Sequence, residues 1–279
     1  MIRKTVTGRE ELLVQRIVNE LDCFANGFTS GEKNYIIGVS GGIDSAICLA
    51  LAVLAVGKDR VIPILMPSNV TSHLSNELAT KLCQRHGIRD VHIRKFDISQ
   101  IAQKYDDQFE HCECKHMFTL AHENLQARIR GTILMTYANQ YNGLVIETCN
   151  KSESLMGYCT LYGDTCGAIS PIGDLYKSEV YSIAKTVKRL KISNAIIMRE
   201  PTAELSDGQK DTDSLPPYNI LDTILIMYYE KKLKIDVIAE MTTAFEQTLT
   251  CFDVNQIIQQ SKDMQFKRDQ SPPTIKLEL

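Results

Sequence analysis

The chain has 279 residues, of which 44% are hydrophobic and 23% charged, and its formal net charge at pH 7 is −3. This composition is typical of a globular protein with a substantial core, and it excludes a strongly cationic surface for binding nucleic acid. The first residues form no apolar signal segment, and no uncharged run approaches the ~20 residues of a membrane span. Nine scattered cysteines, several within apolar runs, favour a reducing, cytoplasmic compartment with free thiols.

Strand-like and helical patterns alternate along the first half of the chain. Helical spacing of apolar residues predicts an N-terminal helix over residues 10–24. Short apolar runs predict four strands, at 35–39, 61–67, 91–96 and 144–149. Further helices are predicted at 44–56, 75–87, 98–109 and 121–141. This alternation indicates an α/β fold, a doubly wound parallel sheet with helices on both faces.

The pattern changes after Pro171. A helix is predicted at 176–190, whereas 200–218 are polar, rich in Asp, Ser and Pro, and predicted to form a long loop. Loops of this length in a compact domain are often lids. The tail at 261–279 contains a Pro-Pro pair and is expected to be extended. We expect a single domain over 1–279, with the helix at 10–24, a core at 35–190, and a lid loop and C-terminal helices at 200–279.

The stretch SGGIDS, from Ser40 to Ser45, follows the first predicted strand and leads directly into a helix. Its two glycines let the backbone approach an anion, and the helix N-terminus adds partial positive charge, so the turn suits phosphate. It lacks the lysine of a Walker A loop and does not fit GxGxxG. Asp44 is either a first-turn helix charge or a ligand of Mg²⁺ that phosphates share. A tight turn without a ligand is the plain alternative.

The fourth predicted strand ends in a second polar segment, which begins with Thr148 and leads into a new helix. Asp44 and Glu153 would then stand at neighbouring strand ends and form a plausible Mg²⁺ pair, although Glu153 could equally be a first-turn helix charge. Lys177 begins another predicted helix, where a lysine opposes the helix dipole unless an anion lies nearby.

Two further segments carry candidate residues. Arg128 and Arg130, in the predicted helix at 121–141, carry planar guanidinium groups suited to phosphate or carboxylate, or else form a solvated basic face. Asp164 follows Tyr162 and a glycine in a turn, and could be merely a turn residue.

SGGxDS resembles the pyrophosphate-binding loop of the N-type ATP pyrophosphatases, which adenylate a substrate and release pyrophosphate. Other segments resemble the NAD synthetase family, in the same order along the chain. They are ENLQARIRG at 123–131, NKSE at 150–153, GYCTLYGD at 157–164, GDLYKSEV at 173–180, EPTAEL at 200–205 and SLPPY at 214–218. The resemblance runs from about Ile36 to Lys267 and Arg268, nearly the whole chain. It is closer to the synthetase half of the two-domain, glutamine-dependent enzymes than to the short ammonia-dependent ones.

This resemblance implies a ligase that joins ammonia to the nicotinic acid carboxylate of deamido-NAD, using ATP and Mg²⁺ and releasing AMP and pyrophosphate. The stretch before the first strand is too short for the glutaminase domain of the two-domain enzymes. We therefore expect free ammonia, or ammonia from a separate glutaminase partner. By the same analogy we expect a homodimer with the dinucleotide site at its interface, in the cytoplasm, with no nucleic acid or membrane partner.

The resemblance also implies roles for individual residues. ATP is expected to contact Ser40, Gly41, Gly42, Ile43, Asp44, Ser45, Arg128, Thr148, Lys177, Thr202 and Ser206. Deamido-NAD is expected to contact Arg128, Lys151, Tyr162, Asp164 and Lys267. Mg²⁺ is expected to bind Asp44 and Glu153, and the catalytic residues are expected to be Asp44, Asp164 and Lys177.

Two features depart from the family pattern. Cys149 replaces the usual glycine before NKSE; it either narrows the pocket or is a core thiol, and we favour the core thiol. Residues 111–122, HCECKHMFTLAH, contain two Cys and three His, but their spacing fits no common zinc pattern. We expect a solvated or dimer-facing loop there.

Two other classes of protein are alternatives. Another SGGxDS adenylating enzyme, such as a tRNA thiolation enzyme or an amidotransferase synthetase subunit, commonly has CxxC pairs or a basic RNA-binding part, and this chain has neither. A degenerate synthetase acting as a nucleotide sensor would not need to retain the metal and phosphate machinery. Its retention here is seen in Ser40, Asp44, Ser45, Glu153 and Lys177.

Overall fold

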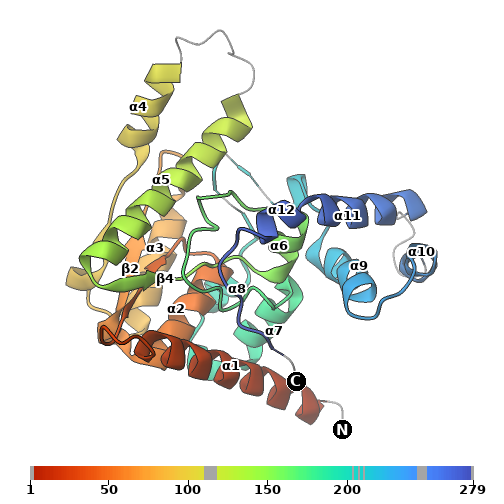
Figure 1. Ribbon diagram of the computed structural model, residues 1–279, viewed down its shortest axis with the longest axis horizontal. Coiled ribbons are helices and arrows are strands. Elements are labelled where there is room, and N and C mark those ends of the chain that lie inside the picture. Colours follow the sequence, from red (N-terminus) through yellow and green to blue (C-terminus); the bar gives the residue numbers. More distant parts are fainter. Residues whose placement is uncertain are drawn as a thin grey trace.

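A four-stranded parallel sheet of order β3-β2-β1-β4 forms the centre of the protein, in a computed structural model (Figure 1). The structure describes residues 3–109, 118–202, 204–206, 208–209, 211–243 and 250–277. The strands are β1 (Asn34–Gly38), β2 (Val61–Leu65), β3 (Arg94–Lys95) and β4 (Gly143–Val145). The predicted parallel α/β fold is confirmed. The third strand is shorter than predicted, because its first residues form a 3₁₀ turn (Asp90–His92).

Helices cover both faces of the sheet and extend beyond it. Those that lie before β4 are α1 (Arg3–Asn26), α2 (Ile43–Val56), α3 (His73–Arg85), α4 (Ser99–Phe109) and α5 (Phe118–Gln140). Those after β4 are α6 (Lys151–Met156), α7 (Lys177–Thr186), α8 (Asn194–Ile197), α9 (Tyr218–Tyr229), α10 (Ile235–Thr243), α11 (Cys251–Asp263) and α12 (Gln265–Arg268). Within the described residues, no helix is both long and apolar enough to cross a membrane.

The period-two alternation of β1 separates the two sheet faces. Tyr35 and Ile37 pack into a core built with α1, α2 and α7, whereas Ile36 packs with α4 and α5 on the opposite face. Tyr35 is fully buried, and its hydroxyl donates a hydrogen bond to the carbonyl of Leu21 at 2.6 Å, so this polar group is not left unpaired in the core. Each face thus buries its own apolar layer, as a parallel sheet requires.

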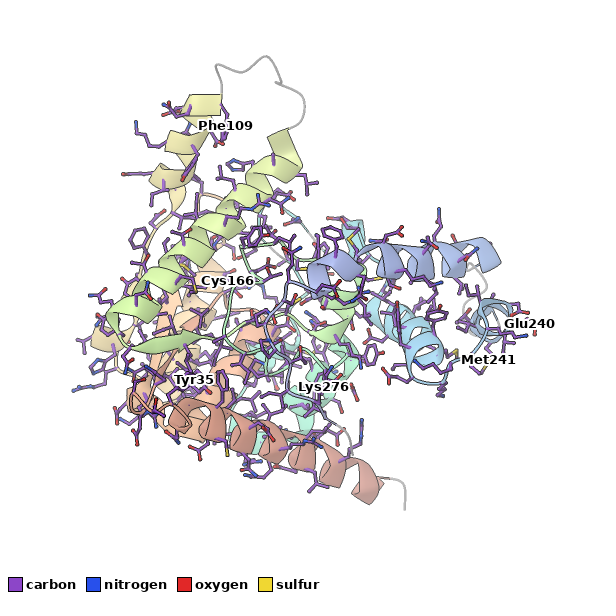
Figure 2. The ribbon with its side chains drawn as sticks, viewed as in Figure 1. Tyr35, Phe109, Cys166, Glu240, Met241 and Lys276 are labelled. Atoms are coloured by element: carbon purple, nitrogen blue, oxygen red, sulfur yellow. The ribbon has the colours of Figure 1, made fainter. Side chains whose placement is uncertain are left out.

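The C-terminal helices form a lobe beside the sheet, with its own apolar cluster from α6, α9, α10 and α11. In Figure 1 this lobe lies at the right, and Figure 2 shows Glu240 and Met241 of α10 at its far edge.

The prediction that the tail at 261–279 is extended is wrong for the first part of this segment. Helix α11 begins with a capping box between Thr250 and Asp253, continues to Asp263, and is followed by α12. Val254, Ile257 and Ile258 recur at helical spacing and bury in the lobe, so this packing favours a helix. Only the final stretch is extended, where the amide of Ile275 donates to the carbonyl of Ser170 at 3.2 Å.

The strand order places a crevice between β1 and β4. The chain leaves β1 toward β2 on one side, while β4 lies on the other side of β1. In open parallel sheets ligands bind at such a switch point, beyond the carboxyl ends of the strands. Here β1 leads to the SGGIDS loop and β4 leads to α6, so both polar segments meet at one edge.

Candidate active site

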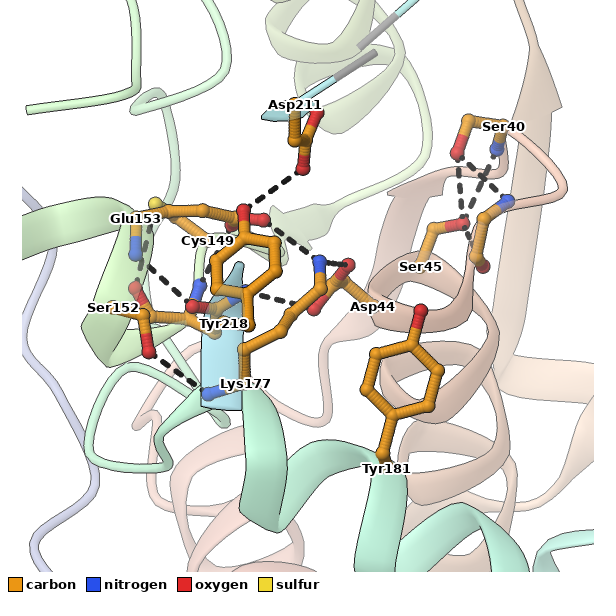
Figure 3. Close-up of polar contacts among 12 residues, drawn as sticks. Ser40, Asp44, Ser45, Cys149, Ser152, Glu153, Lys177, Tyr181, Asp211 and Tyr218 are labelled. Carbon is orange, nitrogen blue, oxygen red and sulfur yellow. Dashed lines mark hydrogen bonds and ion pairs between the residues drawn. The ribbon is translucent and has the colours of Figure 1, made fainter. Parts of the chain in front are cut away.

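The SGGIDS loop is held in shape by its own serines (Figure 3). Ser40 and Ser45 place their hydroxyl oxygens 3.1 Å apart, and the amide of Gly42 donates to Ser40 Oγ at 3.2 Å. Gly41 has a φ of +86°, and a Cβ on it would stand 2.5 Å from the carbonyl oxygen of Ser75 in α3. The loop therefore requires glycine at this position for two reasons, backbone conformation and close packing.

Gly41→Ala is expected to destabilise the fold more than the matched change Gly57→Ala. Gly57 has nearly the same φ, +81°, but nothing lies within 4 Å of a Cβ placed there. The backbone conformation alone should cost each variant about 1–3 kcal/mol. Gly41→Ala should lose at least about 1 kcal/mol more through its clash. Urea unfolding of both variants measures the difference, and equal losses would show that the contact with α3 does not constrain the loop.

Two carboxylates converge on one buried ammonium at the edge of the cleft. Lys177 Nζ lies 2.6 Å from Asp44 Oδ2 and 2.9 Å from Glu153 Oε1, and only 3% of its side chain is exposed. The ring of Tyr218 covers the ammonium, with its centroid 5.1 Å from Nζ. Figure 3 shows the three charged side chains reaching this point from α2, α6 and α7. Asp44 and Glu153, which were predicted to stand at neighbouring strand ends, thus lie together on either side of Lys177.

Asn150 connects the two carboxylates. Its side chain caps α6 by accepting from the amide of Glu153 at 3.1 Å, and its Nδ2 donates to Asp44 Oδ1 at 2.9 Å. Glu153 Oε2 in turn accepts from the amide of Asn150 at 3.2 Å. This capping box fixes the orientation of Glu153, so that its other oxygen faces Lys177.

The N-terminus of α7 has a carboxylate partner of its own. Asp222 Oδ2 of α9 accepts from the amide of Ser178 at 2.7 Å, and the hydroxyl of Ser152 donates to Asp222 Oδ1. The sequence suggested that an anion offsets Lys177 at this helix start. In the structure, the carboxylate of Asp222 binds the backbone amide at the start of α7. Asp44 and Glu153 are the anions that pair with the ammonium of Lys177.

Burial and ion pairing shift the pKa values of the groups in this cluster in opposite directions. Burial lowers the pKa of Lys177, but Asp44 and Glu153 more than compensate and hold it well above its ordinary value. Burial raises the pKa of Glu153 to about 7, with Lys177 opposing the rise and Asp44 adding to it. Two carboxylates that already converge on one cation are a donor set that fits a divalent cation. Across the described residues, no three His, Cys, Asp or Glu side chains are grouped as a ready-made metal site.

The cluster opens into a cleft of about 280 Å³. Most of the predicted site residues lie on its wall. They are Ser40, Gly42, Ile43, Asp44, Ser45, Thr148, Glu153, Asp164, Lys177 and Thr202. Six predicted residues are not part of that wall: Gly41, Arg128, Lys151, Tyr162, Ser206 and Lys267.

Arg128 and Arg130 point in different directions from α5. Arg130 lines the cleft, and its Nε donates to the carbonyl of Met66 at 3.0 Å. Arg128 is exposed, and its Nε donates to the carbonyl of Leu161 at 3.2 Å. The sequence named both arginines but selected Arg128, whereas the guanidinium beside the cleft belongs to Arg130.

The other residues predicted to contact the dinucleotide have protein partners. Lys151 Nζ pairs with Asp174 at 3.0 Å and with Glu230 at 2.9 Å. Lys267 Nζ donates to two backbone carbonyls of the 157–159 turn at 2.7 and 2.6 Å. Tyr162 is 69% exposed. These three side chains lie outside the cleft, and Lys267 holds the turn that leads to Asp164.

Several residues on the cleft wall were missed by the sequence analysis. Asp211 is buried, accepts from the hydroxyl of Tyr218 at 2.8 Å, and has a pKa that burial raises. Arg199 and Glu204 face each other across the same wall. Glu204 lies inside the EPTAEL segment. In that segment only Thr202 was predicted to contact ATP. Asp211 and Arg199 carried no local signal.

Cys149 is buried and lines the cleft beside Glu153. Its thiol donates to the carbonyl of Asn150 at 3.7 Å, and a hydrogen bond with the thiol of Cys159, together with burial, raises its pKa. It is therefore an un-ionised thiol that also narrows the pocket. Most of the Cys/His segment at 111–122 lies outside the described residues; its last member, His122, places Nδ1 3.0 Å from Asp106 Oδ1.

The parallel sheet, with a glycine loop and a cleft at its switch point, is the arrangement of the N-type ATP pyrophosphatase class. Comparison with family models identifies a narrower group. The model described as NAD synthase matches residues 14–271, and the chain belongs to this family.

Relatives and solved structures agree with this assignment. The chain is 38% identical over 262 residues to a glutamine-dependent NAD(+) synthetase of Xanthomonas campestris pv. campestris, covering 91% of this chain and 45% of that protein. It is 42% identical over 220 residues to the protein of that name from Acinetobacter baylyi, covering 76% of this chain and 39% of the relative. The chain thus spans less than half the length of these relatives.

Two solved structures match over nearly their whole length. NMN synthetase from Francisella tularensis superposes with a TM-score of 0.72 at 25% identity, covering 97% of both chains. An NH3-dependent NAD synthetase from Campylobacter jejuni, in complex with the nitrate ion, has a TM-score of 0.72 at 25% identity, covering 93% of this chain and 96% of its own.

Proposed function

We propose that this chain amidates deamido-NAD to NAD with ATP, releasing AMP and pyrophosphate, and that ammonia is the nitrogen donor. One observation carries the proposal: the SGGIDS loop and the NKSE helix start meet at one cleft, where Asp44 and Glu153 converge on Lys177. Membership of the NAD synthase family supports the choice of substrate. We further propose a cytoplasmic homodimer, by analogy with the family.

In the first proposed step, a carboxylate oxygen of the substrate attacks the α-phosphorus of ATP. The bond from that phosphorus to the β-phosphate oxygen breaks, and pyrophosphate leaves. The amides of the glycine loop and the N-terminus of α2 hold the leaving phosphates, and Lys177 neutralises their charge. Asp44 and Glu153 would hold Mg²⁺, which supplies further positive charge beside the phosphate oxygens when bound.

In the second step, ammonia attacks the acyl carbon of the adenylate, and AMP leaves with the electrons of the carbon–oxygen bond. The nitrogen then loses a proton. Asp164, on the cleft wall, is proposed to lie beside the pyridine ring and the incoming nitrogen. Both steps depend on placing and neutralising charges rather than on a protein nucleophile.

A direct assay tests this function. The protein is incubated with ATP, Mg²⁺ and deamido-NAD, with ammonium or glutamine as the donor, and NAD, AMP and pyrophosphate are measured. NAD and AMP formed in equal amounts with ammonium alone is the expected result. No AMP release from deamido-NAD with either donor would contradict the proposal.

A shorter substrate is the second candidate, because the superposed Francisella tularensis protein is an NMN synthetase. Nicotinic acid mononucleotide carries the same reacting carboxylate without the adenylyl half. A parallel assay with this mononucleotide distinguishes the two, and a higher kcat/KM for the mononucleotide would favour NMN synthesis.

A further inference from the structure

Six described residues of the polar loop lie along the cleft. Those on its wall are Glu200, Pro201, Thr202, Glu204, Leu205 and Asp211. A long loop with little regular structure loses considerable entropy when it is held in one place. Specific side-chain contacts must therefore decide whether it stays over the cleft. One contact is the carbonyl of Leu205, which accepts from the buried Gln126 of α5 at 3.0 Å.

Glu204 makes the stronger contact. Its Oε1 accepts from Ser75 Oγ at 2.6 Å and from Arg199 Nη2 at 2.5 Å, and Arg199 Nη2 also donates to Ser75 Oγ at 2.7 Å. The side chains of Arg199 and Glu204 are only 17% and 19% exposed. This is a charge-assisted network largely shielded from water, the kind of pair that stabilises more than a surface ion pair does.

The backbone of Glu204 indicates that this contact holds the loop against strain. Its φ is +47°, in the left-handed region that residues other than glycine rarely adopt. Its amide donates to Thr202 Oγ1 at 3.1 Å, and that hydroxyl donates to the carbonyl of Gln209 at 2.6 Å. Such a conformation persists only where its surroundings over-determine it. The position of Thr202 is thus linked to the docked carboxylate.

Ser75 connects the contact to the phosphate loop. It lies in the first turn of α3 and is fully buried, and its backbone carbonyl is the group packed against Gly41. Glu204 therefore reaches across the cleft to the helix that forms the wall of the SGGIDS loop.

We propose that Glu204 is a positioning residue that, through Ser75 and Arg199, latches over the cleft the described residues of the loop between Glu200 and Asp211. The latched loop keeps water from the acyl adenylate until ammonia reacts, so this inference rests on the proposed function. Without the latch, water attacks the acyl carbon and returns the carboxylic acid and AMP, and ATP is consumed without amide formation.

The first test needs no substrate. Hydrogen exchange is followed by mass spectrometry in peptides covering 200–217 for the wild type, Glu204→Ala and Glu77→Ala. Glu77 is the matched control, because it lies on the same helix as Ser75 but pairs with Lys81 at the surface. Glu204→Ala is expected to speed exchange in this segment about tenfold, and Glu77→Ala is expected to leave it unchanged. Unchanged exchange in Glu204→Ala would overturn the latch whether or not the protein makes NAD.

The second test measures the AMP formed per NAD with limiting ammonium. The wild type and Glu77→Ala should stay near one, and Glu204→Ala should rise at least about threefold, with Glu204→Gln in between because its amide oxygen still accepts. Faster exchange with an unchanged ratio would overturn the role in excluding water. If no NAD forms in the wild type, the proposed function fails, and the exchange experiment alone supports or overturns the latch.

Discussion

Asp44→Asn is expected to reduce AMP and pyrophosphate formation by at least about 10³-fold. The variant removes one of the two carboxylates that converge on Lys177, and with it half of the negative charge able to hold a cation beside the phosphates. The fold should survive, because Lys177 keeps Glu153 at 2.9 Å and an asparagine at position 44 can still accept from Asn150. The measurement is AMP release in the presence of ATP, Mg²⁺ and deamido-NAD, together with a thermal melt.

Asp59→Asn is the matched control for this change. Asp59 carries the same side chain in an exposed 3₁₀ turn and is 88% exposed, so its substitution should affect neither activity nor melting. The Mg²⁺ concentration that gives half-maximal rate is a second measurement, and in any residual activity of Asp44→Asn it should rise. An unimpaired rate in Asp44→Asn would remove Asp44 from the proposed cation site.

The sequence predicted the parts of this site that depend on local patterns. The strand, glycine turn and helix around SGGIDS are local, and so is the start of a helix at the NKSE segment. Parallel strands bring their carboxyl ends to one edge, so the meeting of Asp44 and Glu153 followed from the predicted fold.

Contacts between distant parts of the chain were harder to predict from the sequence. Lys177 was predicted to neutralise a phosphate and Asp44 to bind a metal ion. The 2.6 Å ion pair that they form with each other was not predicted, since 133 positions separate them in the chain. Asp222 caps α7 from a later helix, and no local pattern indicates such a partner.

The choice between Arg128 and Arg130 depends on the rotation of α5. Two residues that are two positions apart on a helix point about 200° away from each other, so only one of them can face the cleft. That rotation is set by packing at Gly131, where a Cβ would stand 2.8 Å from the carbonyl oxygen of Tyr162. Close packing against a remote turn cannot be deduced from helical periodicity, so the sequence could not show that Arg130 is the arginine facing the cleft, and the role of Arg128 stays a prediction.

Glu147 is expected to make the stability of the protein fall as the pH rises. Its amide donates to the carbonyl of Ile169 at 3.1 Å, and it is 4% exposed at the end of β4. Burial raises the pKa of its carboxyl to about 8. Because this pKa lies above that of the unfolded chain, the stabilisation is complete below about pH 4.5 and is lost as the pH rises through 8. Between pH 5 and 9 the loss is about 4 kcal/mol.

Glu147→Gln tests this expectation, because glutamine imitates the neutral carboxyl but cannot ionise. Urea unfolding under reducing conditions should show that the variant gains stability relative to the wild type as the pH rises from 5 to 9. His86, whose pKa burial lowers to about 4, contributes the opposite slope at acid pH, but it is common to both proteins and cancels in their difference.

The exposed Glu20→Gln is the control, and it should retain the wild-type pH dependence. A pH-independent difference between Glu147→Gln and the wild type would mean that Glu147 is already ionised in the fold, adding a third negative charge to the neighbourhood of Glu153 and Asp164. A neutral Glu147 instead leaves Asp44 and Glu153 as the carboxylates that face Lys177, so that no further negative charge opposes the entry of phosphates.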